Sequence, residues 1–209
     1  MIHNPVDLDE YEAQAEIAKE MPPHHDTRIV YTGVIYDAHF SAFQNLIEAL
    51  QTIGNKDIYI HLYTTGSPVD LEKKNITGPV VVHKHLPNSA MPAIQRSADI
   101  LFLPLALNSL YSPEIINTSA PGKLGEYLAA KRPILVHAPK ESFVAKYFKK
   151  FNCGLVVDDD DPEKLAQAII RLLSDRELKE VLIKNAYNKA KTDFDITNAR
   201  KSFFQILNY

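Results

Sequence analysis

The run NTSAPGK near the middle of the chain gathers residue types that bind phosphate. Pro121 suits the first turn of a helix, where a missing N–H costs nothing, and Ser119 or Thr118 is expected to cap the free N–H groups there. Gly122 would let a phosphate approach the backbone closely, and Lys123 adds a positive charge at the same helix end. This combination predicts an anion-binding site at the start of a helix.

Glu126 supplies a second kind of chemistry, a carboxylate about one turn beyond the predicted anion site. It lies three residues after Lys123 and four after Gly122, so a helix would place it on the same face. A carboxylate there can accept hydrogen bonds from the two vicinal hydroxyls of a ribose whose diphosphate occupies the helix N-terminus. The spacing therefore predicts a nucleoside diphosphate site. The alternative reading is a solvated ion pair between Lys123 and Glu126.

A second candidate site is the glycine turn in the run TGVIYD, which follows the first expected strand. Gly33 and Val34 occupy the point where strand leads into helix, and open α/β sheets bind ligands at the carboxyl ends of their strands. The run is not GxGxxG, and the sequence has no GxxxxGK[ST] loop. This argues against a dinucleotide oxidoreductase and a P-loop phosphotransferase. A plain strand-end turn at Gly33 is the structural alternative.

Strands and helices alternate along the chain, which would bring these residues to one edge of a sheet. Six short apolar runs are expected to be strands, at residues 28–32, 58–63, 80–82, 99–104, 133–136 and 154–157. Helical spacing of apolar positions appears between several of them. The pattern predicts an α/β fold, a Rossmann-like doubly wound parallel sheet of about six strands with helices on both faces.

The two ends of the chain differ from this alternating pattern. Residues 1–27 are interpreted as a lead-in or interdomain linker segment, and residues 28–209 as one nucleotide-sugar-binding domain. Extra amphipathic helices beginning near Glu163, Asp175 and Asp195 are expected to close the domain at its C-terminal end.

Composition excludes several classes of function. The chain has 209 residues, 45% hydrophobic and 23% charged, with a net charge of −3, so there is no electrostatic reason to expect a nucleic-acid partner. The single cysteine, Cys153, lies at the entrance of an apolar strand and is expected to be a buried thiol in a reducing compartment. Histidine spacing predicts no metal site. No apolar run is long enough to span a bilayer, and a cytoplasmic protein is the expectation.

The residues around Lys123 resemble the C-terminal, donor-binding domain of retaining glycosyltransferases with the GT-B fold, the group 1 type. The matching run is Ser119, Pro121, Lys123, Glu126, Tyr127, Leu128, Ala129 and Pro133. The run at residues 4–8 is similar to the stretch that follows the interdomain linker in that family. The resemblance covers nearly the whole chain, and it implies a nucleoside diphosphate sugar as substrate with no cofactor.

The resemblance also assigns roles, with departures. In the family, an arginine just after the glycine of the first turn and a lysine a few residues on neutralise the leaving diphosphate. Here Val34 and Ile35 stand where the arginine would be. Either His39 or Lys123 is then expected to supply the catalytic positive charge, or catalysis is weak or absent. His85 is expected to border the nucleobase, unless it is only an edge histidine in contact with solvent.

The sugar-binding part of the family pattern is incomplete. Many of these enzymes carry paired glutamates eight positions apart, and counting back from Glu126 reaches Thr118. The sugar would therefore be held by backbone amides of the loop before Thr118, with help from Asn108, Ser109 or Asn117. The identity of the sugar cannot be read from these residues.

The resemblance thus implies the donor-binding half of an enzyme that transfers a sugar from a nucleoside diphosphate to an acceptor with retention, as in polysaccharide biosynthesis. The acceptor-binding N-terminal half would be a missing domain or a separate subunit, so this chain alone is expected to be inactive. Phe203 and Phe204 are expected in an apolar patch where that half would pack, and a homodimer through such a patch is possible. The alternatives are a non-catalytic nucleotide-sugar-binding or docking module, or a domain similar to sugar-nucleotide epimerases.

Overall fold

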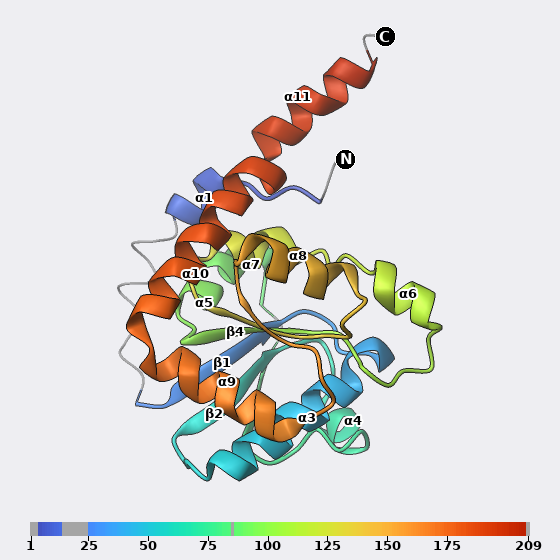
Figure 1. The fold of residues 1–209 in the computed structure, drawn as a ribbon, viewed down its shortest axis with the longest axis vertical. Helices are drawn as coiled ribbons and strands as arrows, with labels where there is room; N and C mark the ends of the chain where they lie inside the picture. Colours follow the sequence, from blue (N-terminus) through green and yellow to red (C-terminus); the bar gives the residue numbers. More distant parts are fainter. Residues whose placement is uncertain (1–3, 14–24, 85, 208–209) are drawn as a thin grey trace.

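A single parallel sheet forms the centre of the protein. The computed structural model describes residues 4–13, 25–84 and 86–207. The strands are β1 (Thr27–Thr32), β2 (Ile58–Tyr63), β3 (Val80–His83), β4 (Ile100–Pro104), β5 (Ile134–His137) and β6 (Leu155–Val157). Their order is β3-β2-β1-β4-β5-β6, and every pairing is parallel. Figure 1 shows the sheet surrounded by helices. The predicted Rossmann-like α/β fold with six strands is therefore confirmed.

Helices cover both faces of this sheet. One face is covered by α3 (Asp37–Ile53), α4 (Pro68–Glu72) and α9 (Pro162–Ser174), and the other by α1 (Leu8–Ala13), α5 (Met91–Arg96), α7 (Leu124–Ala129) and α8 (Phe143–Phe151). Strand side chains alternate between these two layers, so that Ile29 and Tyr31 face α3 while Val30 faces α7. Burial on both faces explains why the strands are continuously apolar in sequence.

Two elements beside the predicted site differ from the expectation. The 3-10 helix Asn88–Ala90 precedes α5, and a short α6 (Pro113–Thr118) precedes α7. Thr118 donates its hydroxyl to the Glu114 carbonyl oxygen (2.7 Å), and Ser119 ends α6. Neither residue caps α7, which begins only at Leu124 with Lys123 at its N-cap. The expected cap was wrong because the chain ends one helix there and makes a turn before beginning the next.

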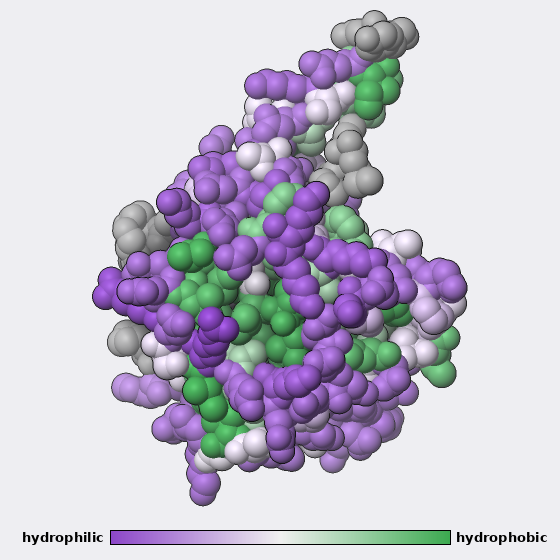
Figure 2. Space-filling model, in the orientation of Figure 1, coloured by the Kyte–Doolittle hydropathy of each residue, from purple (hydrophilic) through white to green (hydrophobic). Residues whose placement is uncertain are grey.

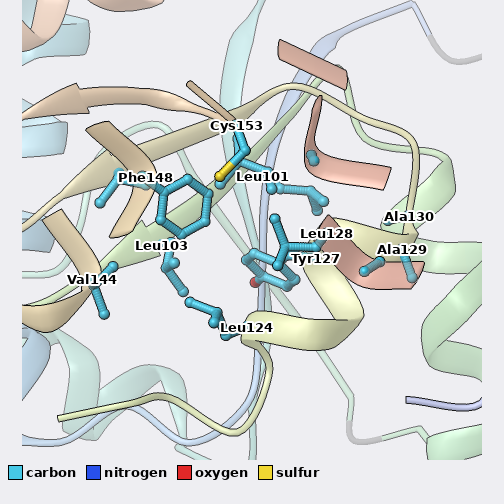
Figure 3. Close-up of a cluster of buried hydrophobic side chains, with 14 of the residues drawn as sticks. Leu101, Leu103, Leu124, Tyr127, Leu128, Ala129, Ala130, Val144, Phe148 and Cys153 are labelled. Atoms are coloured by element: carbon cyan, nitrogen blue, oxygen red, sulfur yellow. The ribbon is translucent and has the colours of Figure 1, made fainter. Parts of the chain in front are cut away.

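The helix α7 is anchored by its buried side. Figure 3 shows Leu124, Tyr127 and Leu128 packed against strand and α8 side chains. All three side chains are at most 1% exposed. With that side of the helix in the core, Lys123 and Glu126 lie on the opposite side, toward the cavity described below.

The N-terminal segment and the C-terminal helices are tied together. Val6 forms a parallel bridge with Asp195, and its N–H donates to the Phe194 carbonyl oxygen (2.7 Å). Helix α10 (Arg176–Lys189) and the π-helical turn Ala190–Phe194 pack on α7. Val6 and Tyr11, two described residues of the segment interpreted as a lead-in, are buried in the core beside α7.

The last helix, α11 (Ile196–Leu207), leaves the domain and extends beyond it (Figure 1). None of its residues is buried, and apolar side chains gather at its far end (Figure 2). Phe203 and Phe204 are 52% and 59% exposed. Within the part of the chain that the structure describes, no helix has both the length and the apolar character needed to cross a bilayer.

Candidate functional site

A cavity of about 640 Å³ opens at the carboxyl ends of β1 and β2, next to the start of α7. It lies beside the point where the strand order reverses between β1 and β4, the usual ligand position in such sheets. Seven of the ten predicted site residues line it, namely Gly33, Val34, His39, Pro121, Gly122, Lys123 and Glu126. The structure thus brings the two glycine turns, separated by about 90 residues, to one cavity.

Lys123 is the cationic centre of this cavity. Its ammonium donates to the Tyr31 phenolic oxygen (2.6 Å) and lies 3.9 Å from the centre of that ring. The phenol in turn donates to the Val34 carbonyl oxygen (2.8 Å), so its oxygen can only accept from the lysine. Burial lowers the pKa of Lys123 to about 7, against the smaller opposing effect of Glu126. A bound anion would favour the charged form and raise this pKa.

His39 lies behind this lysine and is 4% exposed. Burial, and secondly the charge of Lys123, lower the pKa of His39 to about 3, so the imidazole is neutral at physiological pH. Its Nδ1 is 3.5 Å from the Tyr31 phenolic oxygen. This environment argues against the expectation that His39 supplies positive charge, because a buried imidazole next to an ammonium stays neutral. Of these two residues, Lys123 is the one that can carry a charge near neutral pH.

Gly33 is required by its surroundings. Its φ of +122° is a conformation that side chains rarely allow, and a Cβ there would lie 3.0 Å from the Lys123 Nζ. At Gly122 a Cβ would meet only the Asn4 side chain, at 3.6 Å, so that glycine leaves open space rather than relieving strain. Val34 is exposed at the cavity mouth.

Glu126 is held by a residue that the sequence did not single out. The Gln95 amide of α5 donates to Glu126 Oε2 (2.9 Å) and to the Thr32 hydroxyl (3.1 Å), and it accepts from the Tyr11 hydroxyl (2.6 Å). Neither Gln95 nor Tyr31 carried a local signal, because a glutamine in an amphipathic helix and a tyrosine in a strand are ordinary. Only their spatial neighbours distinguish them.

Three predicted residues lie elsewhere or cannot be placed. The Asn108 side-chain amide donates to Asp160 Oδ2 (2.9 Å). Neither Asn108 nor Ser119 is among the residues that line the cavity. His85 lies outside the described residues. Donor contacts by these residues stay predictions.

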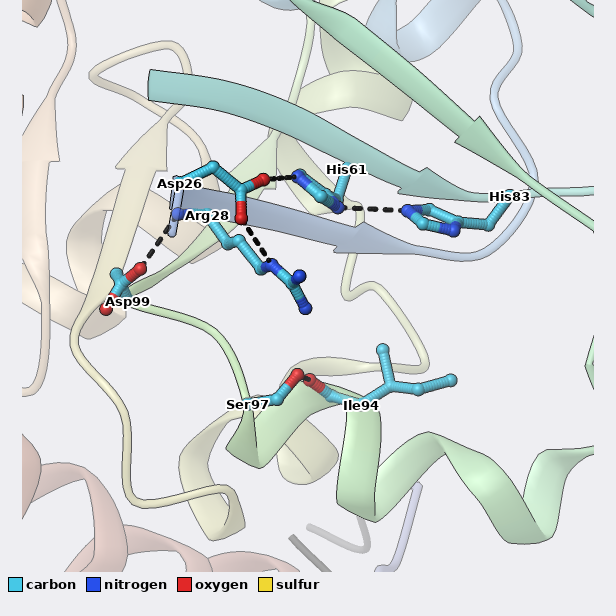
Figure 4. A network of polar contacts seen from close by, with 7 residues as sticks. All are labelled: Asp26, Arg28, His61, His83, Ile94, Ser97 and Asp99. Carbon is cyan, nitrogen blue, oxygen red and sulfur yellow. Dashed lines mark hydrogen bonds and ion pairs between the residues drawn. The ribbon is translucent and has the colours of Figure 1, made fainter. Parts of the chain in front are cut away.

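The cavity also has an apolar part of its lining, formed by Tyr63, Leu86, Met91 and Pro92. The Tyr63 ring stacks on His83 with centroids 4.1 Å apart and planes 3° from parallel. His83 is joined through His61 to Asp26 by hydrogen bonds of 2.9 and 2.8 Å (Figure 4). Burial, with smaller effects of His61 and Arg28, lowers the pKa of His83. This network fixes the Tyr63 wall of the cavity.

Among the described residues, no group of three or more acidic, histidine or cysteine side chains is arranged to hold a metal ion. Cys153 is buried as expected, and burial raises the pKa of its thiol to about 12, so it is unreactive at neutral pH.

Comparison with known proteins gives a consistent picture. The family model of the glycosyl transferases group 1 matches residues 26–175. No curated protein sequence matches the chain. A crystal structure of a glycosyltransferase from Rickettsia africae has a TM-score of 0.70 at 14% identity, over 97% of this chain and 54% of that one.

Two more structures are informative. Anabaena HepE in complex with UDP-glucose has a TM-score of 0.72 at 12% identity, over 99% of this chain and 56% of that one. The C-terminal domain of a glycosyl transferase group 1 family protein (LpcC) from Francisella tularensis has a TM-score of 0.60 at 16% identity, over 91% of this chain and 99% of that one. The chain therefore spans about half the length of the Rickettsia and Anabaena proteins.

Proposed function

Because this chain belongs to the glycosyl transferases group 1 family, we propose that it is the donor-binding half of a retaining glycosyltransferase. The single observation that carries the proposal is the meeting of Gly33, Lys123 and Glu126 in one cavity at the reversal point of the sheet. The donor is a nucleoside diphosphate sugar. The likeness to a protein whose structure contains UDP-glucose supports this class of donor.

The charges in the cavity orient the donor. Among the described lining residues, Lys123 alone has a positive side chain, whereas Asp7, Glu10 and Glu126 are acidic. A diphosphate is repelled by these carboxylates and attracted by the ammonium, so it belongs between Gly33 and Lys123. The ribose then reaches Glu126, which accepts hydrogen bonds from its hydroxyls. The nucleobase extends to the apolar wall that includes Tyr63.

The chemical contribution of this chain is stabilisation of the leaving group. When the bond from the anomeric carbon to the diphosphate oxygen breaks, negative charge grows on that oxygen, and a preorganised ammonium lowers the barrier. The acceptor hydroxyl adds to the same face of the sugar, and its proton leaves with the diphosphate. Tyr31 holds the Lys123 ammonium at this place through its phenolic oxygen.

The acceptor site requires a second half. The chain spans about half the length of the Rickettsia and Anabaena proteins, and the cavity has an open side. The exposed apolar end of α11 is a surface on which that half can pack. We therefore expect donor binding by this chain and no sugar transfer without the acceptor-binding half.

Calorimetric titration with uridine, guanosine, adenosine and thymidine diphosphates tests the proposal. One of the four is expected to bind, and Lys123→Ala and Glu126→Ala are each expected to weaken it about tenfold or more, since each removes a hydrogen bond involving a charged group. Glu141→Ala and Lys146→Ala are matched controls, because this exposed ion pair lies away from the cavity. Failure of all four nucleotides to bind would discard the proposal.

A further inference from the structure

A hydrogen-bond chain of largely buried side chains adjoins the acid of the cavity, and Gln95 is its one member that does not line the cavity. It runs from Tyr11 on α1 through Gln95 on α5 to Glu126 on α7, with a branch to Thr32 at the end of β1. Gln95 is completely buried, and Tyr11 is 3% exposed. Four elements that are distant in sequence thus meet at one amide group.

The amide of Gln95 can adopt only one orientation. A carboxylate only accepts hydrogen bonds, so the NH₂ group of Gln95 must face Glu126, and the amide oxygen must then accept from Tyr11. Burial raises the pKa of Tyr11 far above its usual value, which keeps its hydroxyl proton available for this bond. Both N–H groups and the oxygen of Gln95 have partners, and a flip would turn the amide oxygen toward the Glu126 carboxylate, which breaks that hydrogen bond and sets two acceptors against each other.

Glu126 is therefore held by one oxygen only. Its Oε2 accepts from Gln95 at 2.9 Å, and none of the described residues makes a hydrogen bond to its Oε1. Glu126 lines the cavity, whereas Gln95 does not. The arrangement fixes the carboxylate from behind and leaves acceptor capacity for a ligand.

We propose that Gln95 is a positioning residue that fixes the Glu126 carboxylate for the ribose hydroxyls, and that the Tyr11 hydroxyl holds Gln95 in place. The proposal rests on the proposed donor-binding function and adds a named support to its ribose contact. A buried amide is costly unless all its groups are bonded, and a methionine of similar volume would fill the same space without that cost. The polar contacts of Gln95, rather than its bulk, are what serve the site.

The test compares two ligands, uridine 5′-diphosphate and 2′-deoxyuridine 5′-diphosphate, by calorimetry. The wild-type chain is expected to prefer the ribonucleotide by about tenfold, the loss expected for one hydrogen bond to a charged group. Gln95→Met is expected to lower affinity for the ribonucleotide by about five- to tenfold and for the deoxynucleotide by less than about twofold. Tyr11→Phe, which removes one oxygen atom, is expected to cause a smaller loss with the same selectivity.

Two further variants separate positioning from general structure. Ile94→Met, at a buried apolar neighbour on α5, is the matched control and is expected to leave both affinities unchanged. Gln95→Met combined with Glu126→Ala is expected to bind the ribonucleotide no more weakly than Glu126→Ala alone, because Gln95 acts through that acid.

Other outcomes overturn the inference in distinguishable ways. Equal weakening of both nucleotides by Gln95→Met, or additive effects in the double variant, would show that Gln95 supports the fold rather than Glu126. A wild-type chain that binds both nucleotides equally would remove the ribose contact while leaving the diphosphate site intact. A wild-type chain that binds neither would remove the proposed donor site for uridine nucleotides, and the inference with it.

Discussion

At the scale of single residues, the site depends on one lysine, Lys123, whose pKa lies near neutral pH. Lys123 is surrounded by the Tyr31 ring, its phenolic oxygen and the backbone at Gly33. Such desolvation disfavours the charged form, which explains the pKa of about 7. In the proposed donor site, a bound anion would bring Lys123 to its fully charged form. Lys123 would then take the role of the arginine that the resembled family places after the glycine.

This environment predicts that nucleoside diphosphate affinity depends on pH. In the free protein, Lys123 loses its proton as pH rises through about 7, whereas in the complex the anion keeps it protonated to higher pH. Binding then takes up a proton above pH 7, and affinity is expected to fall by up to about tenfold per pH unit between pH 7 and 9. Titration calorimetry across this range measures the change.

The control for this prediction is Lys123→Met, which has no titrating group at that position. Its affinity should be low and nearly constant over the same range. A wild-type affinity that also stays constant from pH 7 to 9 would contradict the assigned role of Lys123.

At the scale of elements, close packing on both sides of the sheet holds the site edge. Helix α7 has only six residues and no side-chain cap, so its position depends on packing rather than on its own stability. Gly125 allows this approach, because a Cβ there would lie 3.0 Å from the Phe194 ring. A similar close approach occurs where α8 turns back into β6 at Gly154.

Gly154→Ala is expected to destabilise the protein, because the new Cβ would lie 2.6 Å from Phe148 and 2.9 Å from the Ile134 carbonyl oxygen. Overpacking of this kind costs about 1–3 kcal/mol. Gly122→Ala is the matched control, since its Cβ meets only one side chain at 3.6 Å and neither glycine has a positive φ. Urea unfolding should show a loss for Gly154→Ala and a change within about 0.5 kcal/mol for Gly122→Ala. Equal stability of the two variants would contradict this packing.

At the scale of the whole molecule, the far end of α11 carries apolar side chains that none of the described residues buries. Phe203, Phe204, Ile206 and Leu207 are each more than half exposed at the end of a helix that projects from the domain (Figure 1). The self-association expected from the sequence stays a prediction, and these exposed apolar side chains are the physical reason for it.

The isolated chain is expected to self-associate through this helix as its concentration rises. Replacing Phe203 and Phe204 by serine should shift sedimentation velocity profiles toward the monomer while leaving the circular dichroism spectrum unchanged. The matched control is Val181→Ser together with Ile170→Ser, which removes two exposed apolar side chains from α10 and α9. If the α11 variant sediments like the wild type, then α11 is not the surface of association.

Much of this molecule could be predicted from local sequence pattern. Strand and helix periodicity are short-range properties, so the six strands and the C-terminal helices were expected at nearly their observed positions. The same holds for the two glycine turns and for Glu126, because a sharp turn and a carboxylate one turn into a helix are defined by a few neighbouring residues. Their role as a donor site stays a proposal.

What only the tertiary structure decided is which distant groups meet. Tyr31 and Lys123 are 92 positions apart, and Tyr11 and Gln95 are 84 apart, so no local pattern indicates either contact. The protonation of His39 and Lys123 follows from burial, which is a property of the packed molecule. Sequence determines which elements form and where they turn, whereas desolvation and hydrogen bonding between elements determine which residues at those turns carry charge and which are held still.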